Sequence, residues 1–445
     1  MIHIVGAGPA GCLLGILLAR RGVEVQLYER RGDPHGAAAE AGRSINLALA
    51  ARGMRALDTA GVLSRIAPLC VRMRGRQIHE SGRPEQFIAY GQREHEVIWS
   101  VSRAALSATL ADAARELPSL RLHFGQQCLG YGGGRLQMRD LRDGKDYEVS
   151  AERIIGADGA GSVLRHALAQ HDGFTVTEAR LPHDYKELQV PLRAGQAALA
   201  MDALHIWPRG GHMLIALPNA DCTFTATLFL QREADAGAGQ TGFDALQTPQ
   251  QVERFFREEF PDFLALVPDL ARQFLTHPQG MLGTLYCPRW HDAERLLLVG
   301  DAAHAIVPFH GQGMNCAFED CRILDELLQQ DPARAFSRFD NARREDCLAI
   351  AQMALENYGE MRDTVRDPRF QQQKALSLAL ERLYPERFIP RYSMVMFHDE
   401  IPYAVALRRG RIQQQILDEL AIDATPESAA LLVNARLERL PVRAG

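Results

Sequence analysis

The chain lacks features that mark several classes of protein. Its eight cysteines are scattered among 445 residues, with no C-x-x-C pair and no spacing typical of a zinc site, so we expect buried or idle thiols in a reducing compartment. No apolar run approaches the roughly 18 residues that a membrane helix needs. The N-terminus enters a predicted strand at once, without the basic segment and apolar core of a signal peptide. These absences predict a cytoplasmic protein with no membrane partner.

A strong excess of either charge is also missing. Lysine and arginine number 50 against 55 aspartates and glutamates, which gives a formal net charge of −5. This balance of charges does not predict a basic surface that would bind nucleic acid or an anionic membrane. The composition, 47% hydrophobic and 24% charged, is typical of a soluble globular protein. The length predicts two or three domains rather than one.

A glycine-rich segment follows the first predicted strand directly. Ile2–Val5 is a short apolar run, and a leucine-striped helix and a second strand come after the glycines. Gly6 and Gly8 would let the backbone approach a pyrophosphate at the helix N-terminus. Glu29 lies 29 − 11 = 18 residues after Gly11, close to the roughly 20 expected for a carboxylate on a ribose hydroxyl. The pattern predicts a dinucleotide site.

Two later turns repeat the strand-to-glycine pattern. Gly156-Ala157-Asp158-Gly159 and Gly300-Asp301-Ala302-Ala303-His304 each follow an apolar run, and the Asp301 carboxylate could accept a hydrogen bond from a ribityl hydroxyl. Residues 311–315 begin a helix whose positive end would stabilise negative charge on a reduced flavin. Each turn alone could be ordinary, but the three together predict one FAD site.

The rest of the chain predicts two further regions. Strand-like runs separated by turns fill residues 70–102 and 185–232, and helical spacing continues from about residue 336 almost to the end. We therefore expect an α/β protein with a Rossmann-like FAD-binding domain and an inserted antiparallel β-sheet for the substrate. The expected bounds are 1–70, 103–180 and 278–335 for the first, 71–102 and 181–277 for the second, and 336–445 for a C-terminal helical region.

The motifs together resemble a known group of enzymes. G-A-G-P-A-G, G-A-D-G-A-G-S and L-V-G-D-A-A-H-A-I-V-P-F are similar to the group A aromatic hydroxylases, which are single-component FAD monooxygenases. More specific blocks resemble the kynurenine 3-monooxygenase family; they cover residues 42–49, 73–79, 101–103, 205–208, 307–315, 357–361 and 388–392. The final residues, 438–443, lack the membrane segment of the eukaryotic members, so the chain resembles the soluble bacterial form.

The resemblance implies a reaction. L-Kynurenine would be hydroxylated to 3-hydroxy-L-kynurenine with NADPH and O2, by oxygen transfer from a C4a-hydroperoxide of non-covalent FAD. No second dinucleotide-binding motif is present for NADPH, which fits transient binding of the nicotinamide cofactor. The ortho amine of kynurenine already activates its ring, so no strong protein base is obligatory, and water must be excluded from the site.

The resemblance also assigns residues to the cofactor. Those implied to bind FAD are Gly6, Gly8, Ala10, Gly11, Glu29, Arg30, Ala48, Arg103, Cys128, Asp158, Asp301, Gly313, Met314 and Asn315. Pro308, Phe309, His310 and Gly311 would line the flavin side of the pocket. His310 could be mistaken for a catalytic base, but the family often has an aromatic residue there, so we expect it to pack.

The substrate would be held by a second set of residues. These are Arg76, Tyr90, Asn357, Glu360, Met361 and Tyr392. An arginine offers two parallel N–H donors to a carboxylate, but from the sequence alone Arg76 could also be a surface charge beside Arg72 and Arg74. The three residues near 357 have i, i+3 and i+4 spacing and share one helix face, which would also suit ordinary packing.

Other functions stay open at this stage. The main alternative is an FAD hydroxylase of another aromatic acid, such as a salicylate or an anthranilate; the blocks around Arg76, Asn357 and Tyr392 argue against it. A flavin halogenase would carry a W-x-W pair, whereas the three tryptophans are far apart. A non-catalytic FAD-binding or regulatory protein is disfavoured by the intact stretch 308–315. Oligomeric state and the choice between NADPH and NADH are not determined by the sequence.

Overall fold

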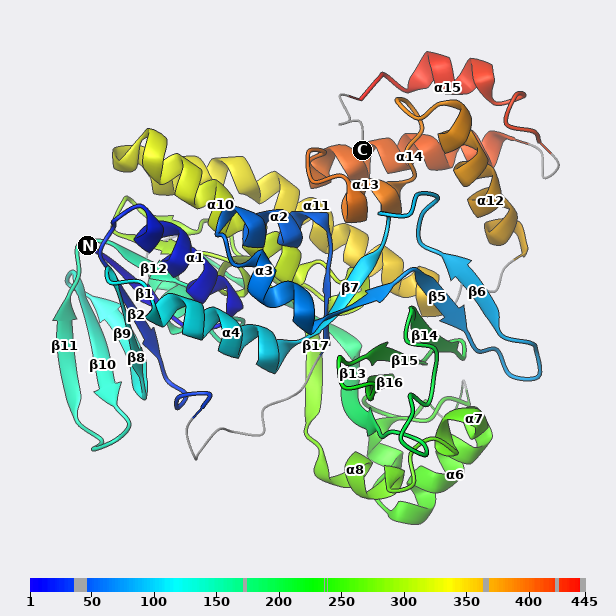
Figure 1. The fold of residues 1–445 in the computed structure, drawn as a ribbon, viewed down its shortest axis with the longest axis horizontal. Helices are drawn as coiled ribbons and strands as arrows, with labels where there is room; N and C mark the ends of the chain where they lie inside the picture. Colours follow the sequence, from blue (N-terminus) through cyan, green and yellow to red (C-terminus); the bar gives the residue numbers. More distant parts are fainter. Residues whose placement is uncertain are drawn as a thin grey trace. The chain divides into compact units, whose positions relative to one another are not determined.

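The computed structural model describes residues 1–35, 46–170, 174–235, 237, 239–362, 368–420 and 424–440. The chain forms two compact units, each built from three separated stretches (Figure 1). Unit 1 comprises Met1–Cys70, Val101–Leu181 and Leu282–Leu348, and unit 2 comprises Val71–Ser100, Pro182–Met281 and Ala349–Gly445.

Unit 1 is centred on a six-stranded sheet. Its order is β18 (His291–Asp292), β19 (Leu296–Leu298), β12 (Ile154–Gly156), β1 (Ile2–Val5), β2 (Val25–Glu29) and β8 (Leu120–Phe124). All neighbouring pairs are parallel except β18 with β19. The central strands β1, β12 and β19 are wholly buried, as expected for a parallel sheet covered by helices. The predicted βαβ opening is present.

Helices surround this sheet. They are α1 (Pro9–Arg20), α2 (Ala51–Thr59), α3 (Leu63–Ile66), α4 (Arg103–Arg115), α5 (Val163–Ala169), α9 (Asp301–His304) and α10 (Gly313–Gln330), and α11 (Ala335–Arg362) begins in this unit. Pro9 takes the first position of α1, where its missing N–H costs no hydrogen bond. The short strands β3 (Asn46–Leu49), β4 (Cys70–Met73) and β7 (Ile98–Ser102) lie at or near the points where the chain changes unit.

A three-stranded antiparallel sheet extends unit 1. It contains β9 (Gln126–Gly132), β10 (Arg135–Asp140) and β11 (Asp146–Ser150) (Figure 1). Gly133 and Gly134, which join β9 to β10, have φ of +58° and +76°. Positive φ at both central residues is the requirement of the two-residue hairpin turn that matches strand twist, and glycine meets it without strain. These strands were not predicted above, although Gly-Gly is a hairpin signal.

A seven-stranded sheet lies largely in unit 2. Its order is β17 (Gln279–Tyr286), β13 (Thr177–Val190), β16 (Phe224–Gln231), β15 (Met213–Pro218), β14 (Ala203–Pro208), β5 (Gly75–Ile78) and β6 (Gln86–Ala89). Antiparallel pairing joins β13 to β16, β16 to β15, β15 to β14 and β5 to β6, whereas β14 pairs with β5 in parallel. That pair can run parallel because the two strands come from stretches far apart in sequence, joined by a long crossover rather than a hairpin.

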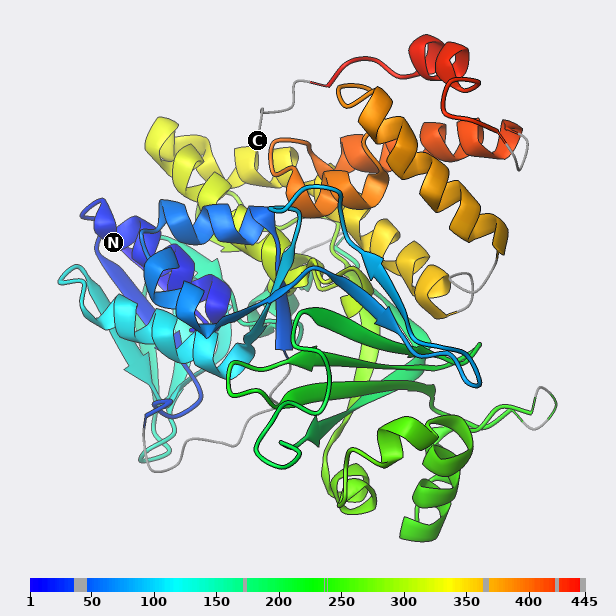
Figure 2. The same cartoon turned by 45° about the vertical axis from the view of Figure 1, so that its right-hand side comes forward.

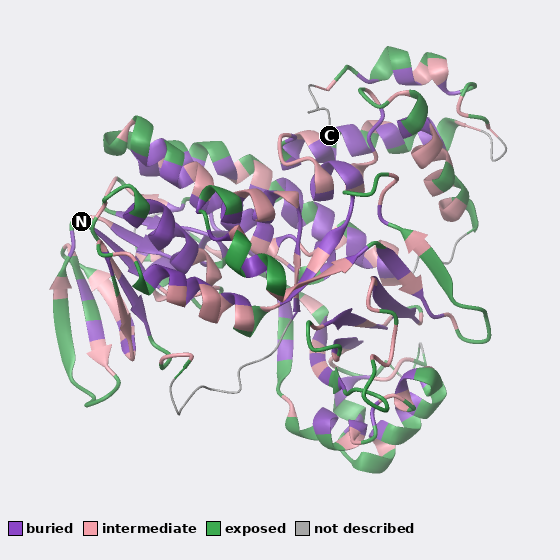
Figure 3. Cartoon of the chain, viewed as in Figure 1, coloured by how far each residue is buried: buried purple, intermediate pink, exposed green. Residues whose placement is uncertain are grey.

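Two groups of helices complete unit 2. Three helices pack phenylalanines against the sheet: α6 (Pro249–Glu259), α7 (Pro261–Leu264) and α8 (Leu270–Thr276). The C-terminal helices α12 (Pro368–Leu383), α14 (Tyr403–Glu419) and α15 (Ala430–Arg436) gather around their own apolar cluster, and α13 (Arg391–Phe397) packs against α14 (Figure 2). Figure 3 shows the buried inner faces of both units. Among the described helices, none combines the length and apolarity that crossing a bilayer requires. The predicted fold class is confirmed.

Candidate functional site

The carboxyl ends of four adjacent strands bring the predicted FAD motifs together. Strands β2, β1, β12 and β19 are neighbours in that order and run parallel; β1, β2 and β12 are labelled in Figure 1. Glu29 ends β2, and Gly6, Asp158 and Asp301 come shortly after β1, β12 and β19, so all four lie at one edge of the sheet. Ligands of open α/β sheets bind outside this edge. Three returns of the chain therefore build one candidate nucleotide site.

The three motif glycines are needed for different reasons. Gly6 has φ of +100°, and a Cβ there would lie 2.4 Å from the Ala157 carbonyl oxygen; a Cβ at Gly11 would lie 1.9 Å from the Gly6 oxygen. These two allow the strand-to-helix turn to close. A Cβ at Gly8 would meet no protein atom within 4 Å, so packing does not require glycine there. Gly8 leaves a cradle at the N-terminus of α1, where a pyrophosphate fits.

Glu29 ends β2 beside this turn. Its Oε2 accepts a hydrogen bond from the Ala7 N–H at 2.9 Å, and its Oε1 accepts one from the Arg31 N–H at 3.0 Å. Burial raises the pKa of Glu29, but the contacts with Arg31 outweigh that effect and leave the pKa below its ordinary value. The ionised carboxylate is an acceptor only, which suits a ribose hydroxyl. Arg30 is exposed next to it.

The turn after β12 has an unsatisfied polar atom. Asp158 Oδ2 accepts the Val163 N–H at 2.8 Å and so caps α5, whereas the buried Oδ1 makes no hydrogen bond to any described residue. A buried carboxylate oxygen without a donor is costly, and a ligand hydroxyl would satisfy it. Cys128 lies near enough for Asp158 to add to the effect of burial, which raises the pKa of that thiol to about 11. Cys128 is therefore a neutral thiol at ordinary pH.

Asn315 is committed to internal contacts. Its Oδ1 accepts the Ala50 N–H at 2.9 Å, and its Nδ2 donates to the Ala48 and Gly311 oxygens, both at 2.8 Å. The side chain thus fixes the turn before α10, where Gly311 has φ of +64°. Residues 313–315 instead offer a cofactor the backbone N–H groups of the first helical turn. These groups have no acceptor within the helix. Phe309 and His310 are buried, and Pro308, Asp301 and Arg103 are exposed.

Unit 2 contains the residues that were predicted to clamp a carboxylate. Arg76 lies on β5 with only 5% of its surface exposed, and its guanidinium carbon is 4.9 Å from the Tyr392 ring centroid and 5.7 Å from that of Tyr90. The two rings stack at 5.7 Å. Arg76 is therefore no surface charge. Tyr90 follows β6, and its N–H donates to the Arg74 oxygen at 3.0 Å, which places it beside β5.

The clamp carries unused hydrogen-bonding capacity. Arg76 Nε and the Tyr90 hydroxyl are buried and make no hydrogen bond within the described part of the chain. Burial raises the pKa of Tyr90 and of Tyr392, so both phenols keep a proton to donate. Burial opposes the charge of Arg76, yet its neighbours hold its pKa above the ordinary value. Buried donors around a cation fit an anionic ligand with two oxygens.

The helix face predicted near residue 357 belongs to the same unit. Asn357 and Met361 are buried near the end of α11, and the Asn357 Nδ2 donates to the Met361 sulfur at 3.3 Å. Glu360 is partly exposed, with its Oε1 4.0 Å from Arg76 Nη1. A cation and a carboxylate side by side match the two charges of an α-amino acid. The start of one family block, residues 42–45, lies outside the described residues.

Comparison with known proteins identifies the family. The family described as "FAD binding domain" matches residues 1–356. A kynurenine 3-monooxygenase of Xanthomonas campestris pv. campestris (strain 8004) is 48% identical over 450 residues, which cover 99% of this chain and 97% of that protein. The chain belongs to the kynurenine 3-monooxygenase family. It is an FAD-dependent monooxygenase, and the predicted family membership is confirmed. A second member, from Xanthomonas axonopodis pv. citri (strain 306), is 47% identical with the same coverage.

Solved structures of lower identity share the fold. The tetrameric form of 2-methyl-3-hydroxypyridine-5-carboxylic acid oxygenase superposes with a TM-score of 0.66 at 19% identity, covering 82% of this chain and 94% of that one. Tetracycline destructase Tet(51) gives 0.59 at 17% identity, covering 84% and 94%. Both likenesses support the aromatic hydroxylase architecture and nothing finer.

Sequence reasoning missed Lys374, which lies on α12. Burial lowers its pKa to about 8, and the Arg76 charge lowers it while the Glu360 carboxylate acts in the opposite direction. The charges of Lys374, Arg76 and Glu360 therefore act on one another. No local signal marks Lys374, because it sits in a glutamine-rich helix and its neighbours at the clamp come from distant parts of the chain.

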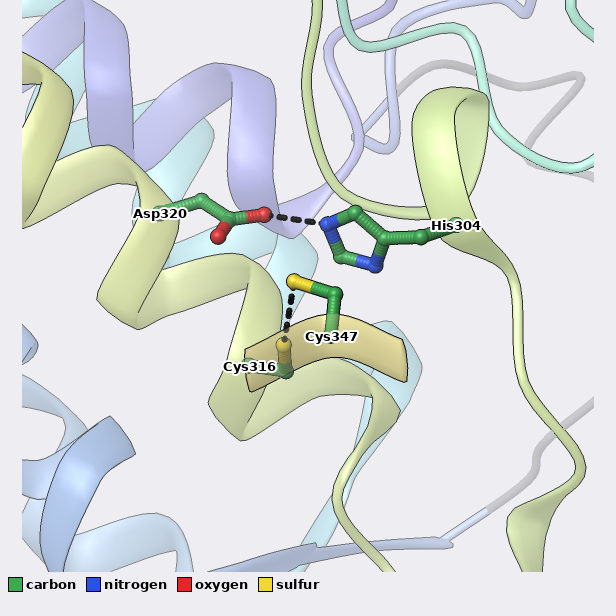
Figure 4. Close-up of side chains that lie close together, drawn as sticks. All are labelled: His304, Cys316, Asp320 and Cys347. Carbon is green, nitrogen blue, oxygen red and sulfur yellow. Dashed lines mark hydrogen bonds and ion pairs between the residues drawn. The ribbon is translucent and has the colours of Figure 1, made fainter. Parts of the chain in front are cut away.

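A chain of buried ion pairs lies behind the Gly300 turn. His304 Nε2 donates to Asp320 Oδ2 at 2.6 Å (Figure 4). Burial alone would lower the pKa of His304, but the Asp320 carboxylate outweighs it and raises the pKa to about 9. For Asp320, burial raises the pKa, whereas His304 and Arg343 lower it to about 2. Both groups are therefore charged at neutral pH.

This pair predicts how stability depends on pH. The raised pKa of His304 gives stabilisation that is complete below its ordinary value of 6.5 and is lost as the pH rises towards 9. The lowered pKa of Asp320 gives stabilisation present above 3.8 and lost as the pH falls towards 2. We expect the melting temperature to decline between pH 6.5 and 9. In His304→Gln, which cannot titrate, this alkaline decline should be smaller; an unchanged decline would contradict the assignment.

Proposed function

We propose that this protein hydroxylates L-kynurenine to 3-hydroxy-L-kynurenine, using NADPH and O2 and non-covalently bound FAD. The observation that carries the proposal is the buried Arg76 clamp, with two phenols and a carboxylate, in a chain 48% identical to proteins named for this reaction. A hydroxylase of salicylate would need a site for a carboxylate but none for an ammonium group.

The protein's part is to bind and orient. Arg76 would bind the α-carboxylate of kynurenine through its N–H fork, and the hydroxyls of Tyr90 and Tyr392 would donate to the same oxygens. Glu360 would accept from the α-ammonium group. The two phenols, the guanidinium and the carboxylate would together fix a single orientation of the amino-acid end of the substrate. Holding the substrate in one orientation lowers the free-energy barrier of the reaction.

The cofactor would be held by unit 1. Gly8 leaves room for the pyrophosphate, Glu29 would accept from the ribose, and Asp301 from the ribityl chain. The N–H groups of residues 313–315 would face the flavin ring. When bound, FAD would supply the redox chemistry that links NADPH and O2 to hydroxylation of the ring.

The proposal extends to the domain bounds and to location. Residues 1–70, 103–180 and 278–335 would form the FAD-binding domain, 71–102 and 181–277 the substrate-binding sheet, and 336–445 the C-terminal helices. The family match over residues 1–356 supports a cofactor role for the first of these. We place the enzyme in the cytoplasm because eight unpaired thiols suit a reducing compartment.

Product analysis tests the proposed reaction. Purified protein incubated with NADPH, O2 and L-kynurenine should release 3-hydroxy-L-kynurenine, identified by mass spectrometry against the authentic compound. Salicylate and anthranilate in parallel reactions should give no hydroxylated product. Their hydroxylation, with kynurenine unchanged, would favour the alternative substrate class. No NADPH oxidation with any of the three, in protein that holds FAD, would favour a non-catalytic flavoprotein.

A further inference from the structure

The buried ion pairs behind Gly300 connect four elements of unit 1. Arg52 on α2 donates to Glu319 on α10 at 2.7 Å, and Glu319 Oε2 lies 2.9 Å from Arg343 Nη1 on α11. Arg343 Nε donates to Asp320 Oδ1 at 2.8 Å, while His304 occupies the other oxygen. All five side chains are buried. The ion pairs run without interruption from α2 to the residues that follow β19.

The same region could be mistaken for a metal centre. His304, Cys316, Asp320 and Cys347 have ligand atoms within 4.8 Å of one another (Figure 4). However, the Arg343 guanidinium contacts two of the four, donating to Asp320 and, at 3.4 Å, to the Cys316 sulfur. Burial raises the pKa of the Cys347 thiol well above its ordinary value. A cation would have to displace or face an arginine, so the cluster fits ion pairing rather than metal binding.

Asp320 has one more partner, and it belongs to the turn itself. Its Oδ2 accepts the Gly300 N–H at 3.2 Å as well as the His304 N–H. Gly300 has φ of +57°, and a Cβ there would lie 3.0 Å from the Ala317 Cβ on α10. One carboxylate on α10 therefore holds the backbone that presents Asp301. The same helix carries residues 313–315 at its N-terminus.

We propose that Asp320 is a positioning residue for FAD. It joins the Gly300–Asp301 turn to α10, so that the acceptor for the ribityl chain and the N–H donors for the flavin ring keep one fixed separation. Two ligand-binding segments held in register before binding lose less freedom when the ligand arrives. The inference rests on the FAD-binding roles proposed above for Asp301 and for the start of α10.

The test compares two aspartates on the same helix. Asp320→Asn weakens the contacts with His304, Arg343 and the Gly300 N–H. Asp325→Asn removes a part-buried ion pair, with Arg21 at 2.6 Å, that does not contact the turn. Both variants should melt at lower temperature. Only Asp320→Asn should raise the Kd of the apoprotein for FAD, measured by fluorescence quenching, by at least tenfold, or about 1.4 kcal/mol; Asp325→Asn should stay within threefold.

A second pair of variants separates positioning from folding. His304→Gln keeps an N–H donor for Asp320 and should bind FAD within threefold of the parent protein, whereas His304→Ala should lose affinity as Asp320→Asn does. Equal FAD affinities of Asp320→Asn and Asp325→Asn would overturn the proposal, as would stoichiometric zinc in the purified protein. Because FAD binding is read without kynurenine, a failure here is distinct from a failure of the proposed reaction.

Discussion

Arg76→Ala is expected to raise the dissociation constant for L-kynurenine by about 30-fold to several thousandfold while FAD stays bound. The buried guanidinium lies against two tyrosines whose rings stack on each other, so its removal would leave the substrate carboxylate desolvated and without a cation. Losing one partner of such a pair costs roughly 2–5 kcal/mol. Substrate titration followed by flavin absorbance measures the change.

Two further variants sharpen this result. Arg76→Lys should recover only part of the affinity, because an ammonium group cannot make the two-pronged contact. Arg74→Ala is the matched control, since that arginine is exposed and pairs with Asp202 on the surface; it should bind kynurenine normally. Near-normal binding by Arg76→Ala, with full FAD content, would show that the carboxylate is held elsewhere.

Gly8→Ala should fold normally and lose FAD. A Cβ at this position meets no protein atom within 4 Å, so the melting temperature of the apoprotein should be unchanged. The added methyl group would occupy the space where the pyrophosphate approaches the N-terminus of α1. We expect FAD affinity to fall at least a hundredfold, or about 2.8 kcal/mol, measured by titration of the apoprotein.

Gly132→Ala provides the control for this change. It also adds a Cβ into open space, but on β9 and away from the glycine turn, so FAD affinity should not change. Gly11→Ala should behave differently from both, because its Cβ would lie 1.9 Å from a backbone oxygen and the apoprotein itself should be destabilised. Full FAD binding by Gly8→Ala would show that the pyrophosphate does not bind at the N-terminus of α1.

Local pattern was sufficient where neighbouring residues fix the structure. The apolar run Ile2–Val5, the glycines and the leucine stripe together predicted β1 and α1, because strand, turn and helix depend on residues within a few positions. The two later strand-to-turn motifs predicted β12 and β19 for the same reason. The specific sequence blocks then identified the family, which the comparisons confirm.

Only the tertiary structure could decide which similar residues are buried. Arg74 lies just before β5 and Arg76 lies on it, and side chains two positions apart in a strand point to the same face. Arg74 is nevertheless exposed, whereas Arg76 lies against Tyr392. Glu360, whose Oε1 lies 4.0 Å from Arg76 Nη1, comes from a helix 360 − 76 = 284 residues later in the chain. The sequence by itself determined the turns, the main strands and the family; the burial of charges was decided by packing between distant segments, which no local pattern records.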